Sequence, residues 1–367
     1  MRMEQVKLTS VCTPKQWKTI PTSELKEEGF PVYGANGIIG YYSDYNHEKS
    51  VVTITCRGAT CGAINITLPY SYVTGNAMCL DNVREDIKQE YLYYFLLSYD
   101  FSKVISGTAQ PQITRQGLEK VVLTIRTPEE QQVIIETLDK IKAIIDCRKQ
   151  ELQTLDELIK ARFVEMFGDP VLNPKKWVTK LLLEMGSCKN GMNFHYDDSG
   201  VEINCLGVGD FQKLSIISDT TVLPMVSLNE MPTDEYLLKD DDIVFVRSNG
   251  NKTLVGRSVA VYPGNVPTTF SGFCIRYRKH DESIIVPYLL QVLKSNSIRT
   301  KMAGRGANIQ NLNQQILRSL IIPVPPKELQ EQFADFIKEV DKSKVVVQKA
   351  LDEAQLLFDS LMQQYFG

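Results

Sequence analysis

The strongest constraint in this sequence is a stretch that occurs twice without a gap, at residues 107–168 and 306–367. Each copy passes from a polar Gly/Gln/Asn loop (107–113 and 306–312) through a short apolar run to an acidic helix start, and each ends in Phe-Gly. Between these landmarks, apolar residues recur alternately four and three residues apart. Four heptads of this spacing are typical of a long coiled-coil helix. The two seams, each with one basic interruption, are Ile134, Leu138, Ile141, Ile145, Arg148, Leu152, Leu155 and Ile159, and Phe333, Ile337, Val340, Lys344, Val347, Leu351, Ala354 and Phe358.

The ends of the first helix carry recognisable capping signals. Thr127 is placed to be the N-cap, Pro128 occupies the first helical position, and Glu130 completes a capping box. Gly168, with Pro170 close behind it, predicts the end of the helix.

Two matched helices in one chain most economically pair with each other. The linker at 169–176 is short, so the second globular region must stay near the far end of the first helix. The second helix can then lie along the first only by running back. We therefore predict an α+β fold with two similar, mainly β domains and an antiparallel coiled coil, related by a pseudo-twofold axis. The predicted segments are a first domain at 1–126, a first helix at 127–168, a second domain at 169–326 and a second helix at 327–367.

The globular regions show short β-rich runs separated by Gly and Asn turns. Strands are predicted at 51–56, 63–68, 78–80, 242–246, 256–262 and 273–277, and helices at 84–102 and 287–297. Two local resemblances suggest divergent copies of one fold. Pro-Lys-x-Trp occurs at 14–17 and at 174–177, as if starting each half, and Ile-Thr-Cys-Arg-Gly (54–58) resembles Val-Phe-Val-Arg-Ser (244–248).

Composition restricts the class of protein. The chain has no charged-then-apolar leader and no apolar run of membrane-spanning length, so a cytoplasmic location is expected. Its eight cysteines are scattered singly and it has only three histidines, which indicates reduced thiols rather than structural zinc.

Net charge is −3, but it is unevenly distributed. Residues 129–168 carry nine acids and six bases, residues 328–367 carry eight acids and four bases, and the rest of the chain is therefore +4. Mildly basic globular regions are compatible with phosphate contacts.

Catalytic motifs are absent from the sequence. It contains no dinucleotide-binding, P-loop, methyltransferase, zinc-protease or serine-hydrolase signature. The acidic clusters at 195–198 (with His195) and 240–242 are interpreted as an exposed loop and a solvated turn rather than metal sites. No catalytic or metal-binding residues are predicted.

The candidate binding sites are polar loops that combine Arg, Lys, Asn or Gln with Gly. Arg reads guanine and Asn reads adenine by paired hydrogen bonds, while Lys and backbone amides hold phosphates. The alternative is that each residue only makes a turn, but the occurrence of such loops in both domains favours nucleic-acid contact. The candidate DNA-binding residues are Tyr33, Asn36, Arg57, Thr60, Lys189, Arg247, Asn249, Asn251, Lys252 and Arg257.

Both helices carry more apolar residues than one seam needs. These residues either pack beneath the globular domains or receive helices from other subunits, and the sequence does not decide between the two. They are Ile144, Leu158, Val345, Val346, Leu356 and Leu357.

Taken together, the repeated loop and helix, the run Tyr-Gly-Ala-Asn-Gly-Ile-Ile-Gly-Tyr-Tyr (33–42) and the run from Arg247 to Ser258 make the chain resemble the specificity subunit of type I restriction-modification systems. The resemblance covers essentially the whole chain. It implies two target-recognition domains that each read half of a split site on double-stranded DNA, separated by helices that act as a ruler. It also implies two methyltransferase (modification) subunits docked on the helices, with restriction/translocase subunits added for cleavage. S-adenosylmethionine, ATP and Mg²⁺ are then expected on those partners and no cofactor on this chain.

Two other classes of function compete with this interpretation. A self-sufficient nuclease or methyltransferase is opposed by the missing motifs. An adaptor that binds only protein is opposed by the polar, basic loops in both domains.

Overall fold

The computed structural model describes residues 4–107, 110–194, 199–211, 216–303 and 311–367. The cluster at 195–198 and most of the second polar loop (306–312) therefore lie outside the described residues. The chain divides into two compact units, Met1–Gln150 with Val347–Gly367, and Glu151–Val346. Both long helices contribute to both units.

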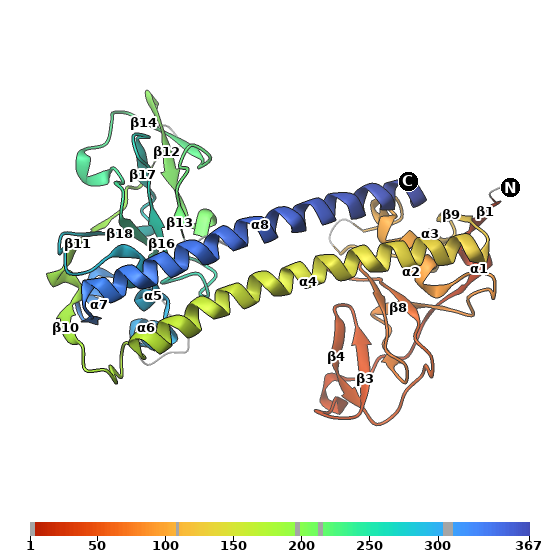
Figure 1. The fold of residues 1–367 in the computed structure, drawn as a ribbon. Helices are drawn as coiled ribbons and strands as arrows, with labels where there is room; N and C mark the ends of the chain where they lie inside the picture. Colours follow the sequence, from red (N-terminus) through yellow and green to blue (C-terminus); the bar gives the residue numbers. More distant parts are fainter. Residues whose placement is uncertain (1–3, 108–109, 195–198, 212–215, 304–310) are drawn as a thin grey trace. The chain divides into compact units, whose positions relative to one another are not determined.

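The first unit holds three small sheets, in the orders β2-β8-β5-β6, β4-β3-β7 and β1-β9. Strands β3, β4 and β8 of this unit are labelled in Figure 1. Its elements are β1 Glu4–Lys7, α1 Leu8–Val11, β2 Thr13–Gln16, η1 Thr22–Glu24, β3 Phe30–Gly34, β4 Gly37–Tyr42, β5 Val52–Thr55, β6 Ile64–Ile66, β7 Tyr72–Val73, β8 Ala77–Asp81, α2 Gln89–Ser98, η2 Phe101–Lys103, α3 Arg115–Leu118, β9 Val122–Ile125 and the start of α4 Pro128–Phe167.

The second unit repeats this plan, with sheet orders β11-β18-β15-β16-β13, β14-β12-β17 and β10-β19. Its elements are β10 Val178–Leu181, η3 Leu182–Glu184, β11 Gly186–Asn190, β12 Val201–Leu206, η4 Val208–Phe211, β13 Ile216–Ile217, β14 Met225–Leu228, η5 Asp234–Tyr236, β15 Asp242–Val246, β16 Ser258–Val261, β17 Thr268–Phe270, β18 Cys274–Lys279, α5 Val286–Lys294, α6 Asn296–Ala303, α7 Gln314–Arg318, β19 Ile321–Val324 and the start of α8 Lys327–Phe366. In both units, the three-stranded sheet joins one antiparallel and one parallel pair. The prediction of two similar, mainly β domains is confirmed.

The predicted coiled coil is confirmed within each unit. In the first unit, Ile134 and Leu138 near the start of α4 share a core with Met362 near the end of α8. In the second, Phe163 near the end of α4 packs 5.6 Å, between ring centroids, from Phe333 near the start of α8. The helices therefore run antiparallel, and every residue of the two predicted seams is buried or half-buried.

The capping prediction for α4 is also confirmed. The Thr127 amide donates to the Glu130 carboxylate over 3.0 Å, and the Glu130 amide donates to the Thr127 hydroxyl over 3.3 Å. At the other end, Gly168 adopts a φ of +79°, which favours glycine, and its amide donates to the Val164 carbonyl.

A buried glutamine ties each long helix to its own unit. The Gln131 side chain accepts from the Lys88 amide and donates to the carbonyls of Asp86 and Arg126. Gln330 accepts from the Ile285 amide and donates to the carbonyls of Ser283 and Pro325. Both glutamines are fully buried. The sequence repeat thus preserves a set of contacts as well as a helical pattern.

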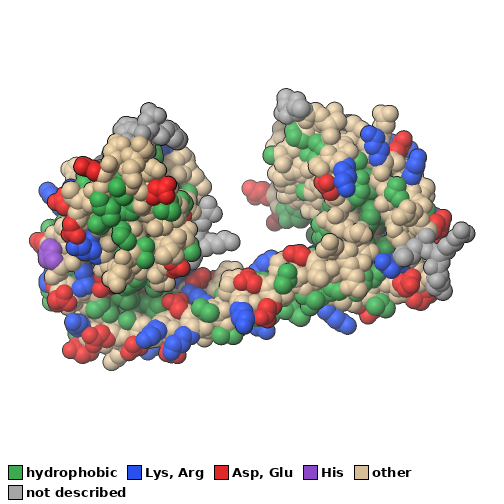
Figure 2. Space-filling view, turned by 90° about the horizontal axis from the view of Figure 1, so that it is seen from above, with side chains coloured by type: hydrophobic (Ala, Val, Ile, Leu, Met, Phe, Trp, Pro, Cys, Tyr) green, Lys and Arg blue, Asp and Glu red, His purple; other side chains and the backbone are tan. Residues whose placement is uncertain are grey.

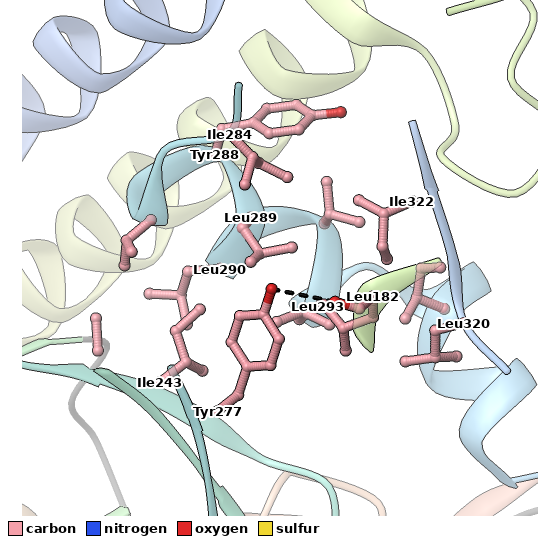
Figure 3. Close-up of a cluster of buried hydrophobic side chains, with 14 of the residues drawn as sticks. Leu182, Ile243, Tyr277, Ile284, Tyr288, Leu289, Leu290, Leu293, Leu320 and Ile322 are labelled. Atoms are coloured by element: carbon pink, nitrogen blue, oxygen red, sulfur yellow. Dashed lines mark hydrogen bonds between the residues drawn. The ribbon is translucent and has the colours of Figure 1, made fainter. Parts of the chain in front are cut away.

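The predicted helix at 84–102 begins late, at Gln89, because the Lys88 amide is taken by the side chain of Gln131. The predicted helix at 287–297 is divided into α5 and α6 by Ser295, which has an extended backbone. Beneath it lies the main core of the second unit (Figure 3), where the Tyr277 hydroxyl donates to the Leu182 carbonyl over 3.2 Å.

The Pro-Lys-x-Trp correspondence between the halves is wrong. Residues 14–16 lie in β2 and pair with β8, within the four-stranded sheet. Residues 174–177 instead cover the end of α4, where the Lys175 ammonium and the Trp177 indole donate to its last carbonyl groups. The structural counterpart of β2 is β11, which pairs with β18. The shared four-residue pattern therefore marks different places in the two units.

The match of residues 54–58 to 244–248 is wrong by one residue. The Cys56 carbonyl accepts from the Ile113 amide, and the equivalent acceptor in the second unit is the carbonyl of Arg247, bonded by Leu312. Cys56 therefore corresponds to Arg247, and Arg57 to Ser248. A slip of one residue along a strand turns a side chain to the opposite face.

Candidate nucleic-acid interface

Two loops of the first unit bring three predicted residues to one exposed surface. Asn36 lies in the tight turn between β3 and β4, where Gly37 has a φ of +84°, and Arg57 and Thr60 lie in the loop after β5. The Thr60 hydroxyl donates to the Asn36 amide oxygen over 2.6 Å. All three side chains are exposed. The two loops therefore present an exposed guanidinium and, three residues further along the same loop, a linked hydroxyl–amide pair, which are groups suited to base edges and phosphates.

Tyr33 does not belong to that surface. It lies in β3 and is only 6% exposed, within the small core formed with Val51 and Val73. Its hydroxyl accepts a hydrogen bond from the Leu68 amide over 3.0 Å. Successive side chains of a strand point to opposite faces, and that of Tyr33 points inward. The predicted DNA contact of Tyr33 is therefore wrong, and its role is structural.

The loop between β15 and β16 (247–257) holds five of the predicted residues of the second unit. Arg247 is exposed and its guanidinium donates to the Gly272 carbonyl over 3.3 Å. The Asn249 side chain accepts from the Asn251 amide over 2.7 Å, and the Asn251 side chain accepts from the amide and hydroxyl of Thr253. Both asparagines thus shape the loop through local turns.

The other two residues of this loop, Lys252 and Arg257, are half-buried. Next to them, the Arg299 guanidinium donates to the carbonyls of Val255 and Gly256. Burial, together with the charge of Arg257, lowers the pKa of Arg299. The end of this loop is therefore a compact basic surface held by backbone contacts.

Lys189 belongs to a different group of side chains. It lies in β11, where its ammonium forms a 2.5 Å ion pair with Glu235 and lies 4.6 Å from the centre of the Tyr236 ring. Hydrogen bonding to Glu235 raises the pKa of Lys189. This lysine is engaged with η5 rather than with the loop at 247–257.

Sequence reasoning missed Arg276, the strand partner of Lys189 in β18. The Arg276 side chain is 5% exposed, and within the described part of the chain its Nε and Nη1 atoms have no hydrogen-bond partner. Burial lowers the pKa of Arg276, with a further contribution from the neighbouring Arg278. The alternation of Arg276, Tyr277 and Arg278, at the end of the predicted strand 273–277 and one residue beyond it, is the available signal that both arginines share a face.

A second group that sequence reasoning missed surrounds Asp81. His47, Cys79 and Asp81 place possible metal-ligand atoms within 4.8 Å of one another. However, the Asp81 oxygens already contact His47 at 3.0 Å and the Trp17 indole at 3.2 Å, and the other His47 nitrogen contacts Asn46 at 2.7 Å. Burial raises the pKa of the Cys79 thiol, so the neutral thiol is favoured. Hydrogen bonding therefore accounts for this group without a metal.

The six apolar residues predicted to bind partners are all exposed, between 46% and 72%. They do not pack beneath the globular parts of their own units. Figure 2 shows apolar, acidic and basic side chains interspersed along the helices. Of the two interpretations left open by the sequence, the structure contradicts burial beneath the globular parts of the unit, and the binding of partner subunits stays a prediction. The residues are Ile144, Leu158, Val345, Val346, Leu356 and Leu357.

The fold and the paired polar loops define a protein built from two copies of one mainly β unit on shared antiparallel helices. A family model for the type I restriction modification DNA specificity domain matches residues 2–157 and 174–354. The chain therefore belongs to this family, and the resemblance inferred from its sequence is confirmed.

Individual relatives agree with this assignment. The chain is 24% identical over 330 residues to the type I restriction enzyme StySPI specificity subunit of Salmonella potsdam, covering 83% of this chain and 66% of that subunit. It is 22% identical over 357 residues to a putative specificity subunit of Haemophilus influenzae, covering 94% and 88%. The chain thus spans about two thirds of the Salmonella relative.

Solved structures support the fold. The S subunit of a type I restriction-modification system from M. genitalium matches with a TM-score of 0.59 and 15% identity, over 100% of this chain and 96% of that one. A chain from a study of complex assembly and conformational transition of the type I R-M system matches with a TM-score of 0.56 and 14% identity, over 99% and 97%. In the described part of the chain, no helix has the length and apolar content needed to cross a membrane.

Proposed function

We propose that this chain is the DNA-reading, non-catalytic subunit of a type I restriction-modification enzyme, acting in the cytoplasm on a bipartite and asymmetric site. One observation carries the proposal. The same point of the fold, the loop between two adjacent strands of the larger sheet, is exposed and polar in both units but differs in sequence. Two DNA-binding units that share a sheet plan but differ in their loops are suited to binding two different half-sites.

The first reader uses Asn36, Arg57 and Thr60, and the second uses Arg247 with the loop that follows it. An exposed guanidinium can bind guanine through two hydrogen bonds, and each such contact contributes roughly 1–3 kcal/mol of discrimination. Lys252 and Arg257 are suited to phosphate contacts, which position the protein without reading sequence.

The partners in this proposal are two methyltransferase subunits, which bind the exposed apolar residues of α4 and α8, and restriction/translocase subunits. S-adenosylmethionine, ATP and Mg²⁺ would be bound by those subunits. Exposed apolar residues along a rigid helix are a suitable surface for helices of other proteins.

The test is to co-purify the chain with its modification subunits, supply S-adenosylmethionine, and sequence the methylated sites. The expected motif has two specific parts of a few base pairs, with unread base pairs between them. The isolated chain, given DNA and all three cofactors, should neither methylate nor cleave. A single uninterrupted palindrome, or activity of the isolated chain, would contradict the proposal.

A further inference from the structure

The larger sheets of the two units differ at one edge. In the second unit, β16 is followed in the sheet by β13, which pairs with it in parallel at Ile216↔Ala260 and Ile217↔Val261. In the first unit the strand equivalent to β16 is β6. The polar loop follows β5 in the first unit and β15 in the second, and β6 and β16 are the antiparallel neighbours of these two strands. Among the described residues, no strand pairs with the outer edge of β6.

Within the described ranges, no backbone hydrogen bond is made on that edge of β6. On its inner side, the Ala63 carbonyl accepts from the Thr55 amide and the Thr67 amide donates to the Val51 carbonyl. Backbone groups alternate in direction along an antiparallel strand. Those of Ile64 and Ile66 therefore point outward, where another strand would bond them.

A pocket of about 320 Å³ lies beside this edge, lined by β6, α2 and α4. Its counterpart in the second unit has a volume of about 530 Å³. The two correspond because the hydroxyls of Tyr91 and Tyr288 make the same bond, to a carbonyl of β9 and of β19 respectively. The pocket residues Glu90 and Tyr93 therefore occupy the places of Pro287 and Leu290.

In the second unit, the strand that covers the edge also contributes to the pocket. Ile216 of β13 lines it together with Pro287 and Leu290. The second unit thus supplies this edge with a strand of its own, and the apolar side chain of that strand lines the neighbouring pocket.

The pocket of the first unit has a different chemistry. Glu90 and Asp139 line it with only one cation, Lys142. The Tyr94 hydroxyl donates to the Asp139 carboxylate over 2.5 Å, and the Lys142 ammonium donates to the Tyr93 hydroxyl over 3.4 Å. Two carboxylates against one ammonium favour a basic side chain as occupant.

We propose that an extended segment of a partner protein pairs with the outer edge of β6 and places a Lys or Arg side chain against Glu90 and Asp139. Strand addition supplies backbone hydrogen bonds, and a pocket for alternate side chains supplies selectivity. The proposal does not depend on DNA binding, and the test below contains no DNA.

The probe is a fluorescent peptide with the sequence of residues 213–219, which includes β13, carrying Ile216→Lys. Fluorescence anisotropy measures its binding to the full-length chain, with the Ile216→Glu peptide as the comparison. We expect saturable binding of the Lys peptide and at least tenfold weaker binding of the Glu peptide. Asp139→Asn keeps an acceptor for Tyr94 and should weaken the Lys peptide several-fold. The matched control Asp146→Asn, an exposed position on the same helix, should leave binding within twofold.

Two N-methylated forms of the Lys peptide, blocked at alternate residues, test strand pairing without altering the protein. One of the two should lose binding, because only one set of its amides faces β6. The proposal is overturned if no saturable binding is seen up to about 1 mM, a weak-binding limit. It is also overturned if Asp139→Asn has no effect, if both methylated peptides bind normally, or if the unsubstituted β13 peptide binds as well as the Lys peptide.

Discussion

The buried glutamines give a direct test of how each long helix is joined to its unit. Gln330 satisfies three backbone groups, namely the amide of Ile285 at 3.0 Å and the carbonyls of Ser283 and Pro325 at 2.9 and 2.8 Å. Leucine at this position would fill most of the volume but bond none of them.

The expected cost follows from these contacts. A net hydrogen bond contributes about 1 kcal/mol, and a buried group left without a partner costs about 1–3 kcal/mol. Water can reach the half-buried Ser283 and Ile285 more easily than the carbonyl of Pro325. We therefore expect Gln330→Leu to lower the free energy of unfolding of the second unit by about 3 kcal/mol. Gln131→Leu should act similarly on the first unit, because its three bonds have the same pattern.

The chain provides its own reporters for the assay. Trp17 lies in the first unit and Trp177 in the second, and they are the two tryptophans of the protein. Variants that retain one tryptophan, with phenylalanine at the other position, allow urea unfolding of each unit to be followed by fluorescence. With a urea dependence of about 2 kcal/mol per M, a loss of 3 kcal/mol moves the midpoint by about 1.5 M.

The matched control is Gln132→Leu, the same substitution one residue along the same helix. Gln132 is half-buried, and its side chain donates to the exposed Glu136 carboxylate instead of to buried backbone groups. Surface changes of this kind usually alter stability by less than about 0.5 kcal/mol. If Gln131→Leu shifts the midpoint no more than Gln132→Leu, the three bonds do not stabilise the unit and the reasoning is refuted.

Three further predictions follow from the loops, the helices and one lysine. Arg57→Ala should relax recognition of one half-site and Arg247→Ala that of the other, by about 1–3 kcal/mol per lost base contact; uniform weakening in a mismatch binding series would indicate phosphate contact instead. Insertion of seven residues after Glu151 and of seven after Ala350 preserves the heptad and lengthens each helix by about 10 Å. The preferred number of base pairs between the two half-sites should then rise by about three. If that number is unchanged while binding is intact, the helices do not set the distance between the half-sites. Burial, with a smaller contribution from the charge of Lys344, lowers the pKa of Lys294 to about 8 in the folded protein, against 10.5 for an ordinary lysine. Between these two pH values the unfolded chain binds more protons than the folded one, so the free energy of unfolding should rise with pH across that window. Lys294→Met should abolish this rise, and an NMR titration of Lys294 near its usual value would contradict it.

The features predicted correctly from the sequence depend on residues close together in the chain. A heptad seam is visible because each position repeats within seven residues, and the capping box joins Thr127 to Glu130, three residues away. The apolar stripe of such a helix must be buried, so the helix packs against another element with a matching apolar stripe. For this reason, the antiparallel pairing and the repeated domain plan could be inferred without a structure.

The wrong predictions involve contacts between residues far apart in the sequence. The start of α2 is set by Gln131, which lies 43 residues from the Lys88 amide it bonds. The polar residues around Tyr33 in the sequence predict a surface position, whereas the strand turns its ring into the core. Neither outcome is encoded in the residues immediately around it.

The internal duplication shows why sheet register is the least predictable part of this fold. An apparent match of Arg57 to Arg247 rests on a shared residue type, but the bonds of Cys56 and Arg247 to the chain near 113 and 312 establish a different alignment. Backbone hydrogen bonds do not depend on side-chain identity, so the sheets can keep one register while the residues along them diverge. The two arginines consequently occupy non-equivalent positions in the two units. Under the proposed function, in which the two halves read different sequences, this arrangement is an advantage, because the framework is held by backbone bonds and buried glutamines while the loop residues can differ.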